Sequence, residues 1–451
     1  MRAINPATEE LIAEYPHHTN DEIIARLHRA HEAFERWRLT PIVERARHFR
    51  LLADELRSGV SHLSRRMTDE MGKPIAQARA EVEKCAWACD YFAEQAGALL
   101  ETRHIDTEAT DSYVTYAPLG PVLAIMPWNF PLWQVFRFAA PAMMAGNVAL
   151  LKHAPNTPGC ARDIVELFDA ADFPTGTFQN LFINERKTEE VIRHSGVAAV
   201  TLTGSTGAGR QVASIAGESL KKCVLELGGS DPFVVLADCD LEEVVEKALV
   251  GRFQNNGQSC IAAKRFIVEE PVYEAFVTRF KSAIEELKVG DPHDEAVDVG
   301  PMARKDLRDE LHKQVKRSIR QGARCLVGGH PLEGKGFFYA PTLLVDVAPE
   351  MPAFDEETFG PVAAVVRARD VDDAIRLANT SAYGLGASLW TTRSRGQTLV
   401  SRFHAGFVAV NEIVKSDPRL PFGGIKDSGF GRELAAEGIH EFTNVKTIYV
   451  A

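Results

Sequence analysis

Apolar residues in the first hundred positions recur at helical spacing. Thr19 and Glu22 form a capping-box pattern, and apolar side chains then follow at every third or fourth position. Two further helices are predicted, over residues 42–71 and 77–95, with a Gly-Lys-Pro stop signal between them. This part of the chain is therefore predicted to be helical.

The pattern changes after residue 110. Residues 112–130 alternate β-branched and aromatic side chains around a Pro-Leu-Gly turn, which predicts a hairpin-like pair of strands ending at Pro127. Short apolar runs alternate with helical patterns over residues 147–227, and a second such set covers residues 232–368. This alternation is typical of an α/β fold with parallel sheets covered by helices on both faces.

Length and the end of the chain refine this picture. A chain of 451 residues is long enough for two or more domains, and a boundary near Gly228 separates the two α/β sets. The final run, residues 441–451, is a strand pattern without a local partner. Such a strand is predicted to pair elsewhere in the chain or on a neighbouring subunit.

Composition excludes several classes of partner. The formal net charge is −11, and the 51 Lys and Arg residues are scattered among 62 Asp and Glu, so neither nucleic acid nor an anionic membrane is an expected partner. No apolar run reaches a membrane span and no leader pattern is found, which predicts a cytoplasmic protein. The 7 cysteines lack metal-type spacing, so no metal site is predicted, and Cys85 and Cys89 are interpreted as core residues.

Cys260 is the first candidate for chemistry. It follows a polar run, QNNGQS, beyond a helix that opens at Asp240 and is predicted to end near Asn255, with Gly257 as terminator. The local sequence leaves a surface thiol and a nucleophile equally open. Because a helix C-terminus disfavours a thiolate, a nucleophile here would need a base or aimed hydrogen-bond donors.

Two residues could supply that help. Glu226 is a lone carboxylate at the end of an apolar strand, and the two glycines after it permit close approach of another backbone or a ligand. Burial would raise its pKa and suit it to general-base work, although a paired structural carboxylate is the alternative. Asn129, between Trp128 and Phe130, is a rigid amide suited to an oxyanion, or part of an aromatic hinge that only packs.

A phosphate site is weakly indicated at residues 201–210. A strand there runs through a turn at Gly204 into a helix that begins around Ser205, a geometry that aims backbone amides at a phosphate. The glycine spacing nevertheless fails the standard dinucleotide fingerprint. Lys152, at the end of another strand, could reach a ribose or phosphate, or could simply be solvated.

Taken together, these motifs resemble the aldehyde dehydrogenase superfamily over essentially the whole chain. In family order they are PWNFP (127–131), Lys152, TGS (203–205), LELGG (225–229), GQSC (257–260), EETFGPV (356–362) and PFGGIKDSGFGRE (421–433). Within the superfamily the chain is most similar to short bacterial succinate-semialdehyde dehydrogenases, through MGKPIAQARAEVEKC, LLKHAPN and CVLELGGSDPF.

The resemblance implies a domain plan. Residues 1–106 and 125–228 would form a Rossmann-variant cofactor-binding domain, and residues 229–430 a catalytic domain. Residues 107–124 and 438–451 would form a small β arm for oligomerisation, so a homodimer or homotetramer is expected.

The resemblance also implies roles. Cys260 would add to the aldehyde, Asn129 and the Cys260 backbone amide would hold the oxyanion, and Glu226 would activate the water that hydrolyses the resulting thioester. Contacts to NADP or NAD would come from Trp128, Lys152, Gly204, Ser205, Glu357 and Phe359.

Two positions depart from the family pattern. Many members carry a Glu three residues after the lysine, where this chain has Pro155, so NADP is predicted to be used, with NAD as the alternative. Arg137 and Ser416 match residues that hold the distal carboxylate of succinic semialdehyde, whereas a second arginine position is Gln254. Other short or ω-carboxy aldehydes therefore stay open as substrates.

The predicted reaction is NAD(P)-dependent oxidation of an aldehyde, with succinic semialdehyde as the leading substrate. A CoA-acylating enzyme would usually lack the base at Glu226, and a purely structural protein would be expected to lose Cys260 or Glu226. An aminoaldehyde dehydrogenase would be expected to have an acidic substrate mouth, against which Arg137 argues.

Overall fold

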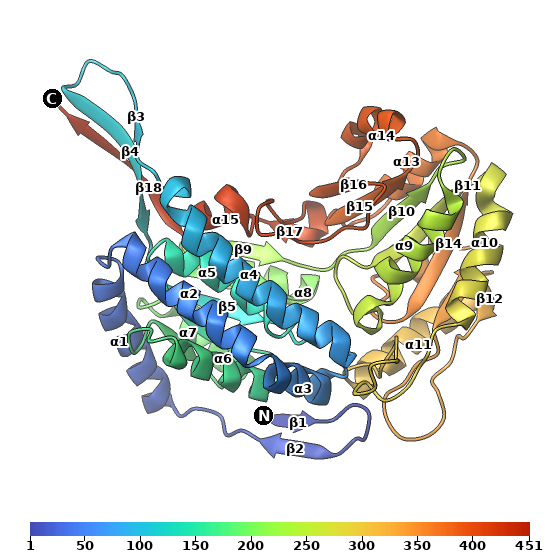
Figure 1. Ribbon diagram of the computed structural model, residues 1–451, viewed down its shortest axis with the longest axis horizontal. Coiled ribbons are helices and arrows are strands. Elements are labelled where there is room, and N and C mark those ends of the chain that lie inside the picture. The colour runs from blue at the N-terminus through green and yellow to red at the C-terminus, as the bar shows by residue number, and fades with distance from the viewer.

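The computed structural model describes residues 1–451 and places them in two α/β lobes with a projecting β arm (Figure 1). The sheet of the first lobe has the order β17 (Gly429–Phe430), β9 (Lys222–Glu226), β8 (Ala199–Thr203), β5 (Pro121–Met126), β6 (Val148–His153) and β7 (Phe178–Asn180). The sheet of the second lobe has the order β12 (Arg324–Val327), β13 (Thr342–Val345), β14 (Val362–Ala368), β11 (Ala263–Glu269), β10 (Asp231–Val235), β15 (Gly386–Trp390) and β16 (Phe407–Val410).

Both sheets are parallel except at one edge. Only β17 and β12 pair antiparallel with their neighbours. The central strands β5, β8 and β10 are mostly apolar and fully buried, as expected for strands covered on both faces. The predicted α/β class is thereby confirmed, and the chain passes from one sheet to the other between β9 and β10.

Helices cover the sheet of the first lobe. They are α1 (Asn20–Trp37), α2 (Ile42–Ser58), α3 (Val60–Met71), α4 (Ile75–Leu99), α5 (Trp133–Met144), α6 (Pro158–Ala170), α7 (Glu185–Arg193), α8 (Thr206–Glu218) and α15 (Ala435–Glu441). The predicted capping box is present, since Glu22 N donates to Thr19 Oγ1 and Thr19 N donates to Glu22 Oε2. The single helix predicted over residues 42–71 is divided at Gly59 into α2 and α3.

The second lobe has its own helices and core. The helices are α9 (Leu241–Phe253), α10 (Glu270–Glu285), α11 (Lys305–Arg320), α12 (Pro352–Asp355), α13 (Val371–Asn379) and α14 (Arg393–Leu399). Near the N-terminus, β1 (Arg2–Ile4) and β2 (Leu11–Glu14) form a separate two-stranded sheet. None of the helices in either lobe combines the length and the apolar character needed to cross a membrane.

The hairpin predicted over residues 112–130 is wrong. β4 (Asp111–Pro118) pairs with β3 (Arg103–His104) and β18 (Thr443–Val450) in the arm, whereas β5 lies at the centre of the first lobe. The amides of Leu119 and Gly120 both donate to Asn147 Oδ1 instead of closing a turn. The Asn147 side chain, distant in sequence, therefore accepts hydrogen bonds from the backbone amides that a tight turn would have used. The boundary predicted at residue 124 consequently falls inside β5.

The arm gives the C-terminal strand its partner. β18 pairs with β4 over its whole length, from Thr443 opposite Pro118 to Val450 opposite Asp111. The ladder extends away from the first lobe, as Figure 1 shows at the upper left. The strand without a local partner therefore pairs within the same chain.

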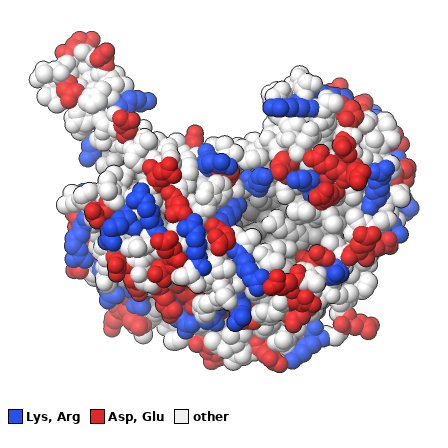
Figure 2. Space-filling view, viewed as in Figure 1, with Lys and Arg blue, Asp and Glu red and all other residues white.

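The lobes face one another across a hollow. Figure 2 shows this hollow between the two rounded masses, with acidic and basic side chains intermixed over the visible face. The segment after β5 reaches the hollow from the first lobe and the segment after α9 reaches it from the second. The candidate residues on these two segments are thereby brought together.

Candidate active site

The loop that carries Cys260 begins with a reversal of the chain. Helix α9 ends at Phe253, and Asn255, Asn256 and Gly257 follow in the left-handed region, with φ of 55°, 58° and 69°. Asn and Gly are the residues that enter this region at least cost. The polar run before Cys260 is therefore explained partly by backbone geometry, and the two asparagines reverse the chain together with the predicted terminator Gly257.

Hydrogen bonds tie this loop to Asn129. Asn255 Nδ2 donates to the backbone oxygens of Asn129 (2.8 Å) and Gln258 (2.9 Å). Asn129 Nδ2 in turn donates to the Gln258 oxygen at 3.2 Å, and Asn129 is buried. One N–H of the Asn129 amide is left over from this contact. The segment after β5 and the Cys260 loop thus form one hydrogen-bonded unit.

A buried lysine and a buried arginine hold the other side of the loop. Lys264 Nζ donates to the backbone oxygens of Ser259 (2.9 Å) and Cys260 (2.8 Å). Arg252 donates to the oxygens of Gly257 (3.0 Å) and Thr358 (3.2 Å). The loop is therefore fixed to the segment that carries Glu357.

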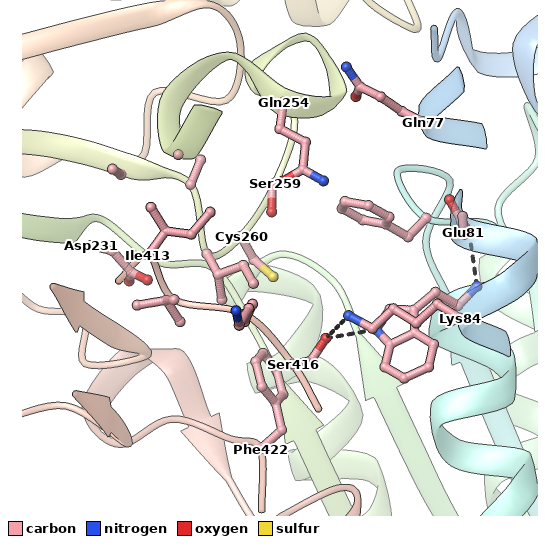
Figure 3. Close-up of a pocket in the computed structure, with 18 of the residues that line it drawn as sticks. Gln77, Glu81, Lys84, Asp231, Gln254, Ser259, Cys260, Ile413, Ser416 and Phe422 are labelled. Atoms are coloured by element: carbon pink, nitrogen blue, oxygen red, sulfur yellow. Dashed lines mark hydrogen bonds between the residues drawn. The ribbon is translucent and has the colours of Figure 1, made fainter. Parts of the chain in front are cut away.

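Cys260 lines a pocket between the lobes (Figure 3). Burial raises the pKa of the Cys260 thiol to about 11, although the positive charges of Arg137 and Lys264 act in the opposite direction. The thiol is consequently protonated at neutral pH, and a nucleophilic Cys260 requires a base.

Glu226 ends β9 with its carboxylate buried and without a hydrogen-bond partner on either oxygen. Burial, and then the negative charge of Glu433, raise the pKa of Glu226 well above its usual range, while Arg137 lowers it. Glu226 is therefore a carboxylate with a raised pKa, as predicted for a buried residue at this position, and Glu433 is a second carboxylate close to it.

Arg137 is engaged within the protein. Its guanidinium forms an ion pair with Glu433, donates to Thr203 Oγ1 at 3.3 Å and lies over the Phe422 ring. Arg137 does line the pocket, but its side chain is only 2% exposed. Its charge is therefore partly neutralised by Glu433 before any substrate binds.

The two glycines after Glu226 make the close approaches that the sequence predicted. A Cβ on Gly229 would lie 2.7 Å from the Cys260 backbone oxygen, and a Cβ on Gly228 would lie 2.4 Å from Glu357 Oε2. Gly229 N also donates to Glu357 Oε1 at 3.0 Å. Larger residues at either position would displace the cysteine loop or Glu357.

The residues predicted for the cofactor lie at the carboxyl ends of the first-lobe strands and beside the hollow. Lys152 lies in β6 and forms no ion pair, and burial lowers the pKa of its side chain. Ser205 caps α8 by accepting from Ala208 N at 3.3 Å, directly after Gly204. The rings of Trp128 and Phe359 meet edge to face with centroids 5.7 Å apart. A cation without an ion pair and a helix N-terminus are donors of the kind that bind the phosphates and riboses of a dinucleotide.

Several buried charges near the pocket were not predicted. They are Lys73, Glu81, Lys84, Lys264 and Glu433. The adjacent Lys264 and Arg265 inside an apolar strand could have predicted a buried charge. Successive strand residues point to opposite faces, so at least one of the two faces the interior. The polar stripe formed by Gln77, Glu81 and Lys84 gave no signal, since stripes at helical spacing usually face solvent.

The donor sets differ from those of a metal centre. No group of three or more His, Cys, Asp or Glu side chains is arranged to hold a metal ion. The chemistry available is that of a thiol and several fixed hydrogen-bond donors at the pocket, with the buried carboxylates of Glu226 and Glu433 beside its lining residue Arg137.

Comparison with known proteins agrees with this geometry. The aldehyde dehydrogenase family model matches residues 1–448. A probable succinate-semialdehyde dehydrogenase [NADP(+)] of Synechocystis is 49% identical, with 100% of both chains covered. The succinate semialdehyde dehydrogenase [NAD(P)+] Sad of Escherichia coli is also 49% identical, with 99% of this chain and 97% of the relative covered.

A solved structure extends the comparison to three dimensions. The succinic semialdehyde dehydrogenase from Streptococcus pyogenes, crystallised in complex with NADP+, superimposes with a TM-score of 0.98 at 33% identity. The match covers 100% of this chain and 99% of that structure. The chain therefore belongs to the aldehyde dehydrogenase family.

Proposed function

We propose that this protein oxidises succinic semialdehyde to succinate with NADP or NAD. The observation that carries the proposal is the Cys260 thiol at the base of a pocket, on a loop bonded to both Asn129 and the Glu357 segment. The full-length relatives named above support the same substrate and cofactor classes.

The first step is nucleophilic addition. Glu226 takes the proton from Cys260, and the sulfur bonds to the aldehyde carbon to give a tetrahedral thiohemiacetal. The free N–H of Asn129 and the backbone amide of Cys260 stabilise its oxyanion. When bound, NADP or NAD supplies the acceptor for the hydride released from this adduct.

The second step is hydrolysis of the thioester left on Cys260. Once Glu226 has released its first proton to solvent, it removes a proton from water, which attacks the acyl carbon, and the Cys260 sulfur leaves and regains a proton. A carboxylate with a raised pKa is suited to both proton transfers. Because Arg137 attracts both Glu226 and Glu433, it holds this pair together while one of them carries a proton.

NADP would be held by residues at the first-lobe strand ends and by the second-lobe segment that carries Glu357 and Phe359. Lys152 would contact the adenosine ribose region, Ser205 the pyrophosphate and Glu357 the nicotinamide ribose, with Gly204 giving close access. Trp128 and Phe359 would line the path. Since position 155 is a proline, no carboxylate there opposes a 2′-phosphate.

The arm is proposed to join subunits. Val445, Tyr449 and Val450 on β18, and Ile105 just after β3, are 60%, 58%, 47% and 44% exposed, an apolar surface that a partner would cover. A homodimer or homotetramer, and a cytoplasmic location, stay predictions.

A rate assay tests the proposed function. Purified protein is assayed for NADPH and NADH formation with succinic semialdehyde, butanal and 4-aminobutanal, beside Cys260→Ala. The expected result is a kcat/KM highest for succinic semialdehyde and no turnover by the variant. Preference for the aminoaldehyde, or turnover by Cys260→Ala, would overturn the proposal.

A further inference from the structure

Lys84 reaches the pocket from helix α4, on the first lobe. It shares one face of α4 with Gln77 and Glu81, both of which also line the pocket. Its Nζ donates to Ser416 Oγ at 2.8 Å and lies 4.4 Å from the centre of the Trp133 ring. Figure 3 shows Lys84 and Ser416 pointing toward one another, beneath Cys260 in that view.

The hydroxyl proton of Ser416 is not donated to any group of the protein. Its Oγ accepts from Lys84 Nζ and also from Trp133 Nε1, at 3.1 Å. A hydroxyl oxygen has two acceptor positions and one O–H donor, so both acceptor positions are occupied. The O–H of Ser416 has no acceptor in the protein. It is therefore available to donate to a ligand beside Lys84.

Lys84 is also the cation of this pocket that lacks a counter-ion. Three cationic side chains line it, namely Lys84, Arg137 and Lys415. Arg137 is paired with Glu433, and Lys415 lies 3.0 Å from Glu412. Lys84 forms no ion pair, although its half-buried side chain contacts Trp133 and Ser416. Its carboxylate neighbours Glu81 and Asp417 are themselves paired with Lys73 and Arg419, so Lys84 is the cation available to an anionic ligand.

We propose that Lys84 is a specificity-determining residue that, beside Ser416, binds the distal carboxylate of an ω-carboxy aldehyde whose aldehyde carbon is at Cys260. This inference rests on the proposed function and names the residues that select its substrate. Lys84 supplies charge that Arg137, shared with Glu433, supplies only in part. Gln254, which also lines the pocket, offers a neutral amide and no positive charge.

Titration of Lys84 should make the binding of a carboxylate at this subsite depend on pH. Burial, followed by the charge of Arg137, lowers the pKa of Lys84 to about 8, while Cys85, Glu81 and Asp417 act in the opposite direction. As pH rises through that value, Lys84 loses its proton and its attraction for a carboxylate. The KM for a carboxylate substrate should therefore rise above pH 8, relative to the KM for an uncharged aldehyde.

The test compares two aldehydes of equal chain length, succinic semialdehyde and butanal. Lys84→Met removes the charge and keeps the length of the side chain, and Lys84→Arg restores a cation. Lys316→Met, on the exposed face of α11, is the matched control. In Lys84→Met the ratio of kcat/KM for succinic semialdehyde to that for butanal should fall roughly 10- to 100-fold. Lys84→Arg should recover part of the ratio, and Lys316→Met should leave it at the wild-type value.

Other outcomes overturn the inference. If Lys84→Met lowers kcat/KM for both aldehydes equally, or leaves the ratio within threefold, Lys84 does not bind the carboxylate. If Lys84→Met does not fold, the wild-type KM ratio is measured from pH 6 to 10, and a flat ratio counts against the subsite. A wild type that turns over butanal and not succinic semialdehyde instead refutes the proposed function.

Discussion

The Lys264 ammonium group lies 3.3 Å from the Glu357 carboxylate, and the Lys264 side chain is completely buried. The same Nζ donates to the Ser259 and Cys260 backbone oxygens. One cation therefore couples the nucleophile loop to the residue proposed to hold the nicotinamide ribose.

Lys264→Met should disturb both sides of this contact. Loss of one partner leaves Glu357 without its cation and two loop carbonyls without a donor, at a cost of roughly 3–5 kcal/mol in folding stability. The KM for NADP should rise and the melting temperature should fall. Lys247→Met is the control, because the Lys247–Glu412 pair is about one-third exposed and is expected to contribute at most about 1 kcal/mol. Equal effects of the two substitutions would argue against the coupling.

Glu433→Gln should shift the pH dependence of hydrolysis. Because Glu433 raises the pKa of Glu226, removing its charge lowers the pKa of Glu226. Glu226 must be ionised to act as a base, so the acid limb of kcat against pH should move to lower pH. Pre-steady-state and steady-state rates measured from pH 5 to 9 check this. An unchanged limb, or one displaced to higher pH, contradicts the assignment.

A second buried ion pair positions the start of α5. Lys73 is paired with Glu81, whose Oε1 accepts from Leu132 N (3.0 Å) and Trp133 N (2.9 Å). Lys73→Met leaves the Glu81 carboxylate buried without its cation, which should cost roughly 3–5 kcal/mol of unfolding free energy. Urea denaturation followed by circular dichroism measures this. A loss below about 1 kcal/mol would show that the pair is dispensable.

Pro155→Glu tests the cofactor assignment. A carboxylate three residues after Lys152 would repel a 2′-phosphate and accept hydrogen bonds from a ribose. KM for NADP should therefore rise at least tenfold, and KM for NAD should change much less. Pro155→Gln controls for loss of the proline. If Pro155→Gln and Pro155→Glu affect NADP equally, charge at this position is not the discriminator.

The sequence was informative where one local pattern dictates one structure. Buried strands such as β8, capped helices such as α1 and the change of sheet at Gly228 follow from apolar periodicity and from glycine placement. The motif residues could be assigned roles through the resemblance alone, because no local rule distinguishes Cys260 from a surface thiol.

Long-range pairing could not be read in the same way. The pattern of residues 112–130 predicts a hairpin because its two strands are adjacent in sequence. In the structure, Asn147 accepts from the two amides between these strands. The strand β18, more than 300 residues away, pairs with β4 instead. The place of Lys84 in the pocket could not be predicted from the sequence for a related reason. Its surroundings are Ser416 and Trp133, which are brought to it only by the folded chain.

The central claim is that a thioester forms on Cys260 and is hydrolysed with the help of Glu226. The most direct measurement is intact and peptide mass spectrometry of Glu226→Gln after mixing with succinic semialdehyde and NADP. The account predicts slow accumulation of one succinyl group per chain, on the peptide containing Cys260, together with one equivalent of NADPH, because Glu226→Gln slows proton removal from Cys260 and blocks hydrolysis of the thioester. Continuous turnover by Glu226→Gln without an adduct, or an adduct on another residue, would contradict it.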